Sequence, residues 1–217
     1  MRYFQLQKSA FHSLKRRWGL ANVCLILCFF LYSPLMFISE SVNLYSLIRY
    51  DMEIELPLWY TILDIVSSII LTSTLSLGQY FIFLSISRMQ HVRLADLFVF
   101  LKSGRMILRA ILGSIIPALY ILLWSLLLII PGIYKAFCYA MTPYILVDHP
   151  ELSVRQAMQK SIHLMRGHKW HYFVLGLTFT GWIILSIFTL GIGFLWVIPL
   201  INATNAKFYL TIQDQQR

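Results

Sequence analysis

Long apolar runs separated by short basic or turn-forming segments constrain this chain more than any other feature of its sequence. A helix needs about 20 mostly apolar residues to cross the hydrocarbon core of a bilayer, and six runs approach or exceed that length. Because 59% of the 217 residues are hydrophobic and only 12% are charged, polar groups cannot cover the apolar surface, and lipid is the expected solvent. We therefore predict an all-α fold, a polytopic transmembrane helical bundle in which residues 1–217 form a single integral membrane domain. The predicted spans are about 20–38, 57–86, 107–130, 133–147, 170–190 and 194–212.

The basic residues gather in three segments, 1–19, 88–109 and 148–169, which alternate with an acidic loop and two tight turns. Cytoplasmic loops of membrane proteins carry an excess of Lys and Arg. Six spans put all three segments on one side, so we predict that both the N- and the C-terminus face the cytoplasm. If Pro131-Gly132 were a kink, a five-span chain would break this pattern, and the sequence leaves open whether residues 131–133 form a true turn or a kink. The net charge of +9 is thus explained by membrane topology, and we expect no nucleic-acid partner.

Two of the basic segments have the pattern of amphipathic helices that lie at a membrane surface. Residues 1–19 hold five basic residues and no acid, with apolar residues at helical spacing. In the other segment, Ser153 and Gln156 fit a capping box, and Gly167 fits the C′ position that ends a helix. We predict that this second helix lies on the cytoplasmic leaflet and that its basic residues contact anionic lipids. The candidate anionic-lipid contacts are Arg155, Lys160, Arg166 and Lys169.

A weak internal similarity relates two parts of the chain. The sequence Val-Arg-Leu-Ala at 92–95 resembles Val-Arg-Gln-Ala at 154–157, and each begins an amphipathic segment followed by a span, a glycine-containing turn and a second span. Two spans per unit would make the repeat parallel. Duplication and chance similarity between two interfacial helices explain this pattern equally well.

A stripe of polar residues follows one face of the predicted span 57–86, at steps of three or four residues. An ionisable residue inside a span is by default a functional hypothesis. However, Asp64 is only seven residues past Pro57, about 10 Å from the start of the span at 1.5 Å per residue. Small hydroxylated residues also let helices pack closely, so we favour packing over a solute or proton path. The stripe consists of Thr61, Asp64, Ser68, Thr72, Ser76 and Gln79.

Residues that bind metals or perform catalysis are scarce. Only His168 and His171 have the spacing of a helical metal-binding pair, and they flank Trp170, where cationic and aromatic residues gather at a membrane surface in any case. The three cysteines fall in apolar runs, where a thiol is usually a small packing residue. The sequence contains no nucleophile elbow, zinc-protease motif, phosphate loop or dinucleotide fingerprint. We therefore predict no metal site, no cofactor and no catalytic residue.

Several motifs, from the N-terminal helix and from most of the chain after about residue 94, together resemble a known family. They include Lys8-Ser9-Ala10, Trp18-Gly19, Ile130-Pro131-Gly132-Ile133, Asp148-His149-Pro150-Glu151-Leu152-Ser153, Leu164-Met165-Arg166-Gly167-His168-Lys169-Trp170, Gly181-Trp182, Thr189-Leu190-Gly191-Ile192-Gly193 and Phe208-Tyr209. The sequence is similar to a family of bacterial integral membrane proteins catalogued as domain of unknown function nine hundred seventy-five. Leu200 departs from it, since the family usually has Tyr after Pro199. The resemblance implies a multi-pass protein of the bacterial plasma membrane, and it implies no reaction, substrate or catalytic residue.

Three classes of function compete. We favour a non-catalytic accessory, lipid-interacting or partner-binding membrane subunit, whose expected partners are membrane lipids and either another membrane protein or a second copy of the chain. The alternative is a small-solute transporter or export component, because Pro131-Gly132 and Gly191 interrupt apolar stretches at comparable places in the two candidate repeats. An intramembrane enzyme is the least favoured class, since no catalytic motif supports it.

Overall fold

The computed structural model describes residues 3–15, 17–31, 41, 44, 45, 48 and 57–216. Within these ranges every regular element is a helix and no strand is present, so the predicted all-α fold is confirmed. Residues 32–38 of the first predicted span, and most of the predicted acidic loop that follows it, lie outside the described residues.

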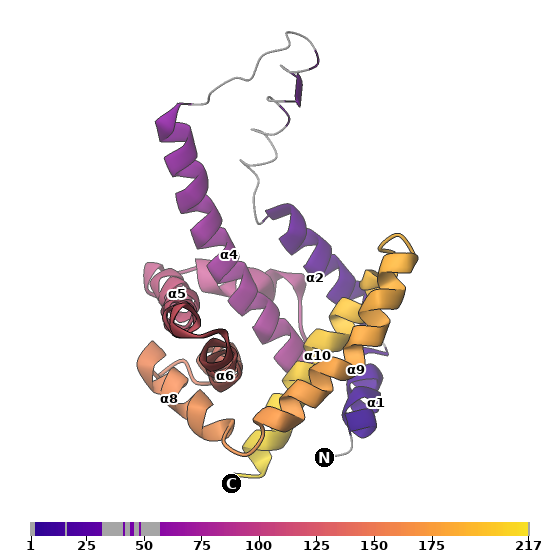
Figure 1. Cartoon of the computed structure of the whole chain (residues 1–217). Coiled ribbons are helices and arrows are strands. Elements are labelled where there is room, and N and C mark those ends of the chain that lie inside the picture. The colour runs from indigo at the N-terminus through magenta and orange to yellow at the C-terminus, as the bar shows by residue number, and fades with distance from the viewer. Residues whose placement is uncertain are drawn as a thin grey trace.

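Ten helices follow one another in the described part of the chain (Figure 1). They are α1 (Tyr3–Leu14), α2 (Trp18–Leu31), α4 (Leu58–Ser87), the 3₁₀ helix η1 (Leu94–Leu101), α5 (Gly104–Leu127), α6 (Ile129–Tyr139), α7 (Thr142–Asp148), α8 (Val154–Leu164), α9 (Lys169–Phe188) and α10 (Phe194–Asp214). Three of them, α4, α5 and α9, are long and apolar enough to cross a membrane, and α2 is a shorter apolar helix.

The helices lie close to the predicted spans. Helix α4 covers the predicted span 57–86, α9 covers most of 170–190, and α10 covers 194–212. The predicted span 133–147 is divided between α6 and α7, which meet at residues 140–141. The predicted helices are therefore present, and three of them are candidates for crossing a membrane.

The first hairpin, formed by α5 and α6, turns at a different residue from the one predicted. We expected a turn at Pro131-Gly132, but the chain turns at Leu128, which is extended with φ −160° and ψ 142°, and α6 begins at Ile129. Pro131 lies in the first turn of α6, where its fixed φ fits a helix and its missing N–H costs no hydrogen bond. Residues 131–133 are therefore neither a turn nor a kink but part of the start of a helix.

The second hairpin, formed by α9 and α10, turns where we predicted, at Gly191-Ile192-Gly193. Gly191 has φ +87°, in the left-handed region that favours glycine. The hydroxyl of Thr189 accepts a hydrogen bond from the backbone N–H of Gly193 at 3.0 Å. The Thr189 side chain therefore supplies an acceptor for one backbone N–H of this turn, which needs no water there.

A serine and a glycine bring the two helices of each hairpin together. A Cβ added at Gly132 would lie 2.8 Å from the Cα of Ser125, and one added at Gly193 would lie 2.8 Å from the Cα of Ser186. In each hairpin the glycine follows the serine by seven residues, and the serine hydroxyl donates to the carbonyl four residues before it. The two hairpins thus share a close Ser–Gly contact, although the segments that precede them differ, a 3₁₀ helix in η1 and an α-helix in α8.

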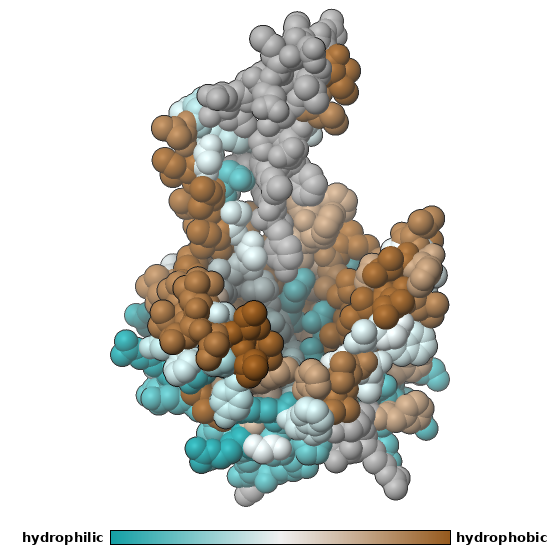
Figure 2. Space-filling model, in the orientation of Figure 1, coloured by the Kyte–Doolittle hydropathy of each residue, from teal (hydrophilic) through white to brown (hydrophobic). Residues whose placement is uncertain are grey.

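Apolar and charged surfaces lie at opposite ends of the molecule. Figure 2 shows hydrophobic residues over the upper part and hydrophilic residues over the lower part, and Figure 1 shows α1, α8 and the end of α10 at the hydrophilic end. The tips of both hairpins are strongly apolar, with Ile130 81% exposed and Leu190 94% exposed. An exposed apolar surface of this extent is typical of a membrane protein.

Helix α4 is central and contacts α1, α2, η1, α5, α7 and α10. Helix η1 packs closely on it because Gly78 leaves room for the backbone carbonyl of Leu97. In Figure 1, α5 and α6 are seen nearly end-on, whereas α4, α9 and α10 are seen from the side. The first hairpin is therefore strongly inclined to the other long helices.

Helix α1 has the two faces expected of an amphipathic helix. Ala10 and Leu14 are buried, and α1 packs against α10 and α4. Gln7 adds a hydrogen bond from its Nε2 to the hydroxyl of Thr178, at 2.7 Å. On the opposite side, Phe4 is 76% exposed, so this helix joins the bundle by one face and keeps an aromatic side chain outward.

Candidate functional site

A buried carboxylate joins three helices at the charged end of the molecule. Asp148, at the end of α7, forms an ion pair with Arg88, whose Nη2 lies 2.6 Å from Asp148 Oδ1. Its Oδ2 accepts hydrogen bonds from the hydroxyl of Tyr209 at 2.9 Å and from Nε2 of Gln213 at 3.2 Å. The Asp148 side chain is only 11% exposed. We call these four residues the Asp148 cluster, which connects the C-terminal ends of α4, α7 and α10.

The Asp148 cluster holds its carboxyl in the ionised form. Burial by itself would raise the pKa of Asp148, but hydrogen bonds from Arg88 and Tyr209, the charge of Arg88 and the hydrogen bond from Gln213 outweigh it. The pKa of Asp148 is therefore below its ordinary value. This charge is fully engaged in holding helices together, which is a structural role.

A second cation, Arg109 of α5, closes the end of α7. Its Nη2 donates to the carbonyls of Leu146 at 3.1 Å and His149 at 2.7 Å, and its Nη1 donates to the carbonyl of Pro150. The last carbonyls of a helix have no partner within the helix, so a guanidinium there supplies the missing donors. Arg109 therefore fixes α5 to the end of α7 beside the Asp148 cluster.

The four candidate anionic-lipid contacts have different surroundings. Arg155 and Arg166 are exposed. Lys160 is half-buried and contacts Nε2 of His149 at 2.7 Å. Lys169 lies over the ring of Tyr134, with its Nζ 3.6 Å from the centroid. Among the described residues, neither Arg155 nor Arg166 has a side-chain contact of this kind.

The apolar face of α8 meets protein, where we had expected it to lie on the leaflet. Val154, Ala157, Met158 and Leu164 are buried, and the hydroxyl of Ser161 donates to the backbone carbonyl of Cys138 at 2.7 Å. Helix α8 contacts α5, α6 and α7. An amphipathic pattern requires an apolar partner without specifying lipid, and here the partner is the bundle. The face of α8 that the bundle leaves open is therefore its charged outer face.

The polar stripe of α4 is divided. Four of its residues lie in the half of α4 that precedes the first buried residue, Ser73. Asp64 Oδ1 is enclosed and has no hydrogen-bond partner in the part of the chain that the structure describes. Ser76, further along the stripe, lines a cavity. The four residues are Thr61, Asp64, Ser68 and Thr72, while Gln79 is half-buried outside that cavity.

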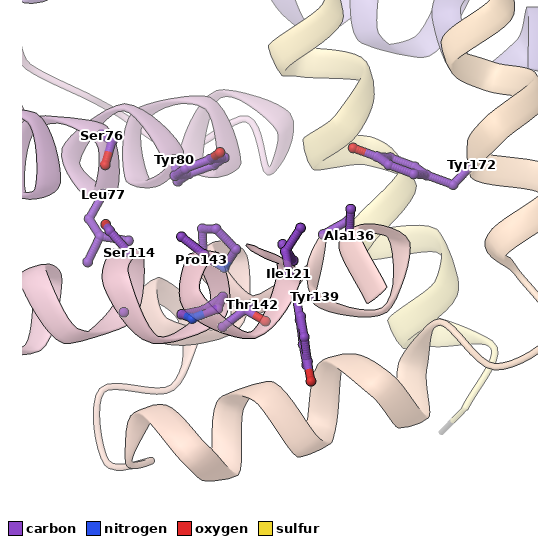
Figure 3. Close-up of a pocket in the computed structure, with 14 residues that line it drawn as sticks. Ser76, Leu77, Tyr80, Ser114, Ile121, Ala136, Tyr139, Thr142, Pro143 and Tyr172 are labelled. Atoms are coloured by element: carbon purple, nitrogen blue, oxygen red, sulfur yellow. The ribbon is translucent and has the colours of Figure 1, made fainter. Parts of the chain in front are cut away.

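The cavity that Ser76 lines has a volume of about 400 Å³ and lies between α4, α5, α6, α7 and α9 (Figure 3). Small residues in α5, among them Gly113 and Pro117, help to leave this space open. No charged side chain lines it. We call it the hydroxyl cavity, because hydroxyl groups supply its polar side chains: Ser76, Tyr80, Ser114, Tyr139, Thr142 and Tyr172.

Several of these hydroxyl groups have unused hydrogen-bonding capacity. In the described part of the chain, the phenol groups of Tyr80 and Tyr172 make no hydrogen bond, and Figure 3 shows them turned toward each other from different helices. The side chain of Thr142 is completely buried, and its oxygen has no partner among the described residues. A buried hydroxyl without a partner costs about 1–3 kcal/mol. The phenol groups of Tyr80 and Tyr172 are therefore the hydroxyls best placed to pair with a ligand in the cavity.

A second cavity, of about 330 Å³, lies beside α9 and shares Tyr172 with the first. Its walls are mainly aromatic and aliphatic, and Leu177 on its rim is 53% exposed. Asn205 and Thr180 are its other polar lining residues. We call it the apolar cavity. Tyr172 therefore lines both the hydroxyl cavity, which is polar and uncharged, and the apolar cavity.

The histidines do not form a metal centre among the described residues. His168 and His171 have ring centroids 6.2 Å apart, but His168 Nε2 contacts the side-chain oxygen of Gln215 at 3.0 Å. No group of three His, Cys, Asp or Glu side chains in the described ranges lies close enough to hold a metal ion.

Sequence reasoning missed both the Asp148 cluster and the cavities. Asp148 and Tyr209 are 61 positions apart, and their hydrogen bond depends on how α7 meets α10. The available signal was weak: an acid at the end of one predicted span and a tyrosine near the end of another. The cavity had a comparable signal in the small residues Gly113 and Pro117 within a long apolar run.

Comparison with known proteins identifies a family for the C-terminal part of the chain. No curated protein and no solved structure matches this sequence. Residues 125–216 match the family described as "Protein of unknown function (DUF975)", a match that includes Asp148, Tyr209 and the Ser–Gly contacts of both hairpins. The N-terminal motifs of the resemblance fall outside the matched range. The similarity to the DUF975 family of proteins of unknown function is therefore shown for residues 125–216, from the end of α5 to α10.

Proposed function

We propose that this chain is a multi-pass protein of the bacterial plasma membrane that acts without catalysis as a lipid-interacting subunit. The observation that carries the proposal is the hydroxyl cavity, an uncharged space of about 400 Å³ among helices whose outer surface is apolar. Cavities of roughly 300–1,000 Å³ with apolar walls and a few polar groups are typical of small-molecule sites. A molecule that reaches this one through an apolar surface comes from the membrane.

The lining of the hydroxyl cavity suits binding better than bond cleavage. The groups that most often act as general acids or bases, His, Asp, Glu and Lys, do not line this cavity, and nucleophilic catalysis needs a base beside the nucleophile. Ser76 and Ser114 instead donate to backbone carbonyls of their own helices, at 3.0 Å in each case. The remaining side chains offer hydrogen bonds to a ligand without an activating partner.

We further propose six spans with both termini in the cytoplasm, formed by α2, α4, α5, α6 with α7, α9 and α10. Helix α1 and the end of α10 lie at the hydrophilic end of the molecule, which supports this topology. Helix α8, in the basic segment 148–169, also lies at that end, as expected for a cytoplasmic segment. Because the first hairpin is inclined, α5 and α6 would cross the bilayer obliquely.

Reporter fusions test the topology. Green fluorescent protein fused after Arg217 should fluoresce, and alkaline phosphatase fused at Asp51, which lies outside the described residues, should be active. An inactive phosphatase at Asp51 together with a dark C-terminal fusion would reject six spans with cytoplasmic ends.

Lipid analysis tests the function. The full chain purified in a mild detergent should retain a defined lipid, visible as a discrete mass adduct by native mass spectrometry. A protein that carries no lipid, and instead co-purifies with a stoichiometric membrane protein or as a homo-oligomer, would favour the partner-binding form of an accessory subunit.

A small-solute transporter or export component is the second candidate, and the two matching hairpins favour it. Transporter sites often lie where two structural repeats meet, and an intramembrane acid can carry a proton. Asp64 has an enclosed oxygen without a partner among the described residues, as a proton carrier would. Loss of a growth phenotype in Asp64→Asn, with normal folding and membrane insertion, would support transport; an unchanged phenotype would count against it.

A further inference from the structure

We propose that the hydroxyl cavity and the apolar cavity together bind one molecule of an uncharged glycerolipid, a diacylglycerol, with its polar end in the first and an acyl chain in the second. This inference rests on the proposed lipid-interacting function and names its ligand class. It follows from the chemistry of the two linings and from their shared residue, Tyr172.

The polar end of the ligand must be uncharged and able to both donate and accept hydrogen bonds. No charged side chain lines either cavity, so a phosphate or an ammonium group would lose water without gaining a counter-ion. Tyr80 and Tyr172 can donate to ester carbonyls, and each phenol oxygen can also accept a hydrogen bond from a free hydroxyl. A diacylglycerol offers both kinds of group and carries no charge.

The depth of the hydroxyl cavity fits a lipid with a small head. Tyr80 and Ser76 precede Arg88, the cation at the charged end of α4, by eight and twelve residues. At 1.5 Å per residue they lie about 12 and 18 Å from that end along the helix, within the hydrocarbon of the adjoining leaflet. A charged phospholipid head at this depth would be expensive, whereas an uncharged one reaches it when hydroxyl groups pair with it.

The apolar cavity is suited to an acyl chain. Its walls include the aromatic rings of Phe137 and Phe173 and the aliphatic side chains of Ile183 and Ile201. Ile183 is 36% exposed and Leu177 is 53% exposed, so one side of the cavity faces the surroundings of the bundle. A chain can therefore enter from the membrane while the polar end passes Tyr172.

Titration with defined lipids tests the proposal. We would titrate the full chain in mild detergent with dioleoylglycerol and, separately, with anionic dioleoyl phosphatidylglycerol, and follow adducts by native mass spectrometry. We expect one saturable dioleoylglycerol site and weaker, non-saturating phosphatidylglycerol binding. Tyr172→Phe keeps the ring and removes one neutral hydrogen bond, so the dioleoylglycerol affinity should fall about fivefold. Ala136→Leu, which fills the hydroxyl cavity, should abolish the adduct.

Tyr120→Phe is the matched control, because it removes a phenol from α5 that lines neither cavity and is 45% exposed. The dioleoylglycerol affinity of Tyr120→Phe should equal that of the wild type. A melting curve for each variant identifies any variant that fails to fold. Equal affinity in Tyr172→Phe, Ala136→Leu and the wild type would overturn the site. Saturable phosphatidylglycerol binding without dioleoylglycerol binding would overturn the ligand class and leave the proposed function standing, while no bound lipid of either class would overturn both.

Discussion

Removing the carboxylate of Asp148 should destabilise the fold by an amount that its contacts allow us to estimate. In Asp148→Ala, the completely buried Tyr209 and the Gln213 amide each lose their hydrogen bond to this carboxylate. Loss of a buried hydrogen bond to a charged group costs about 1–3 kcal/mol. Arg88 is 32% exposed and can regain water, so loss of the ion pair adds only about 0–1 kcal/mol. We expect a total loss of about 2–4 kcal/mol, and about half of that for Asp148→Asn, which keeps one acceptor oxygen.

Unfolding in mixed micelles of dodecylmaltoside and sodium dodecylsulfate, followed by tryptophan fluorescence, measures this change. Glu151→Gln is the control, because this carboxylate is 64% exposed and should leave the unfolding midpoint unchanged. The pKa of Asp148 is lowered in the folded state, so its stabilisation is complete above the ordinary aspartate pKa of about 4 and is lost as pH falls through the lower folded value. The difference between wild type and Asp148→Asn should therefore be constant at neutral pH and shrink below about pH 4. Equal stability of both Asp148 variants and the wild type at pH 7 would refute this reasoning.

Three further results are expected. Gly132→Ala should lower the free energy of unfolding by about 1–3 kcal/mol in the same assay, because its Cβ has no room against α5. Gly181→Ala is the control and should be neutral or stabilising, because nothing lies within 4 Å of its added Cβ. Equal behaviour of the two variants would mean that the close approach of α5 and α6 is unimportant. Arg109→Gln should lower the free energy of unfolding by about 1–3 kcal/mol and increase hydrogen exchange at the end of α7, since three backbone carbonyls lose their donor. Unchanged hydrogen exchange there would contradict the capping role. A peptide of α8 should bind anionic vesicles, ignore neutral ones and dissociate as salt rises, with the preference reduced when Arg155 and Arg166 become Gln; salt-insensitive binding to both kinds of vesicle would end the lipid-contact hypothesis.

Features that depend on residues close together in the sequence were predictable. The capping box of α8 forms as expected: the backbone N–H of Ser153 donates to Gln156 Oε1 at 2.8 Å, and the N–H of Gln156 donates to Ser153 Oγ at 3.4 Å. Gly167 has φ +82°, in the left-handed region that ends many helices, although it lies two residues past the cap residue Met165. Such features can be predicted because the capping residues lie within a few positions of the helix end that they cap.

Features that depend on which surfaces meet were not predictable from one sequence. The pattern of α8 predicts an apolar partner, and only the packing of Ala157 and Leu164 against other helices tells protein from lipid. The turn at Leu128 has no sequence signal, because the apolar run continues through it and the nearby Pro131 and Gly132 point to a later turn. The hydroxyl cavity requires five helices to converge, and no periodicity within any one of them indicates this.

The two hairpin tips also bear on how the chain enters a membrane during synthesis. From Leu126 to Ile130, and again from Leu190 to Ile192, neither tip contains a charged or strongly polar side chain. Moving a charged loop through hydrocarbon requires each charge to lose its water, whereas these tips carry nothing that must stay hydrated. In the proposed six-span topology, each pair of helices can therefore be inserted from one side as a preformed unit, with the Ser–Gly contact already made. In that topology, the translocation machinery would export only the acidic segment between the first two apolar helices.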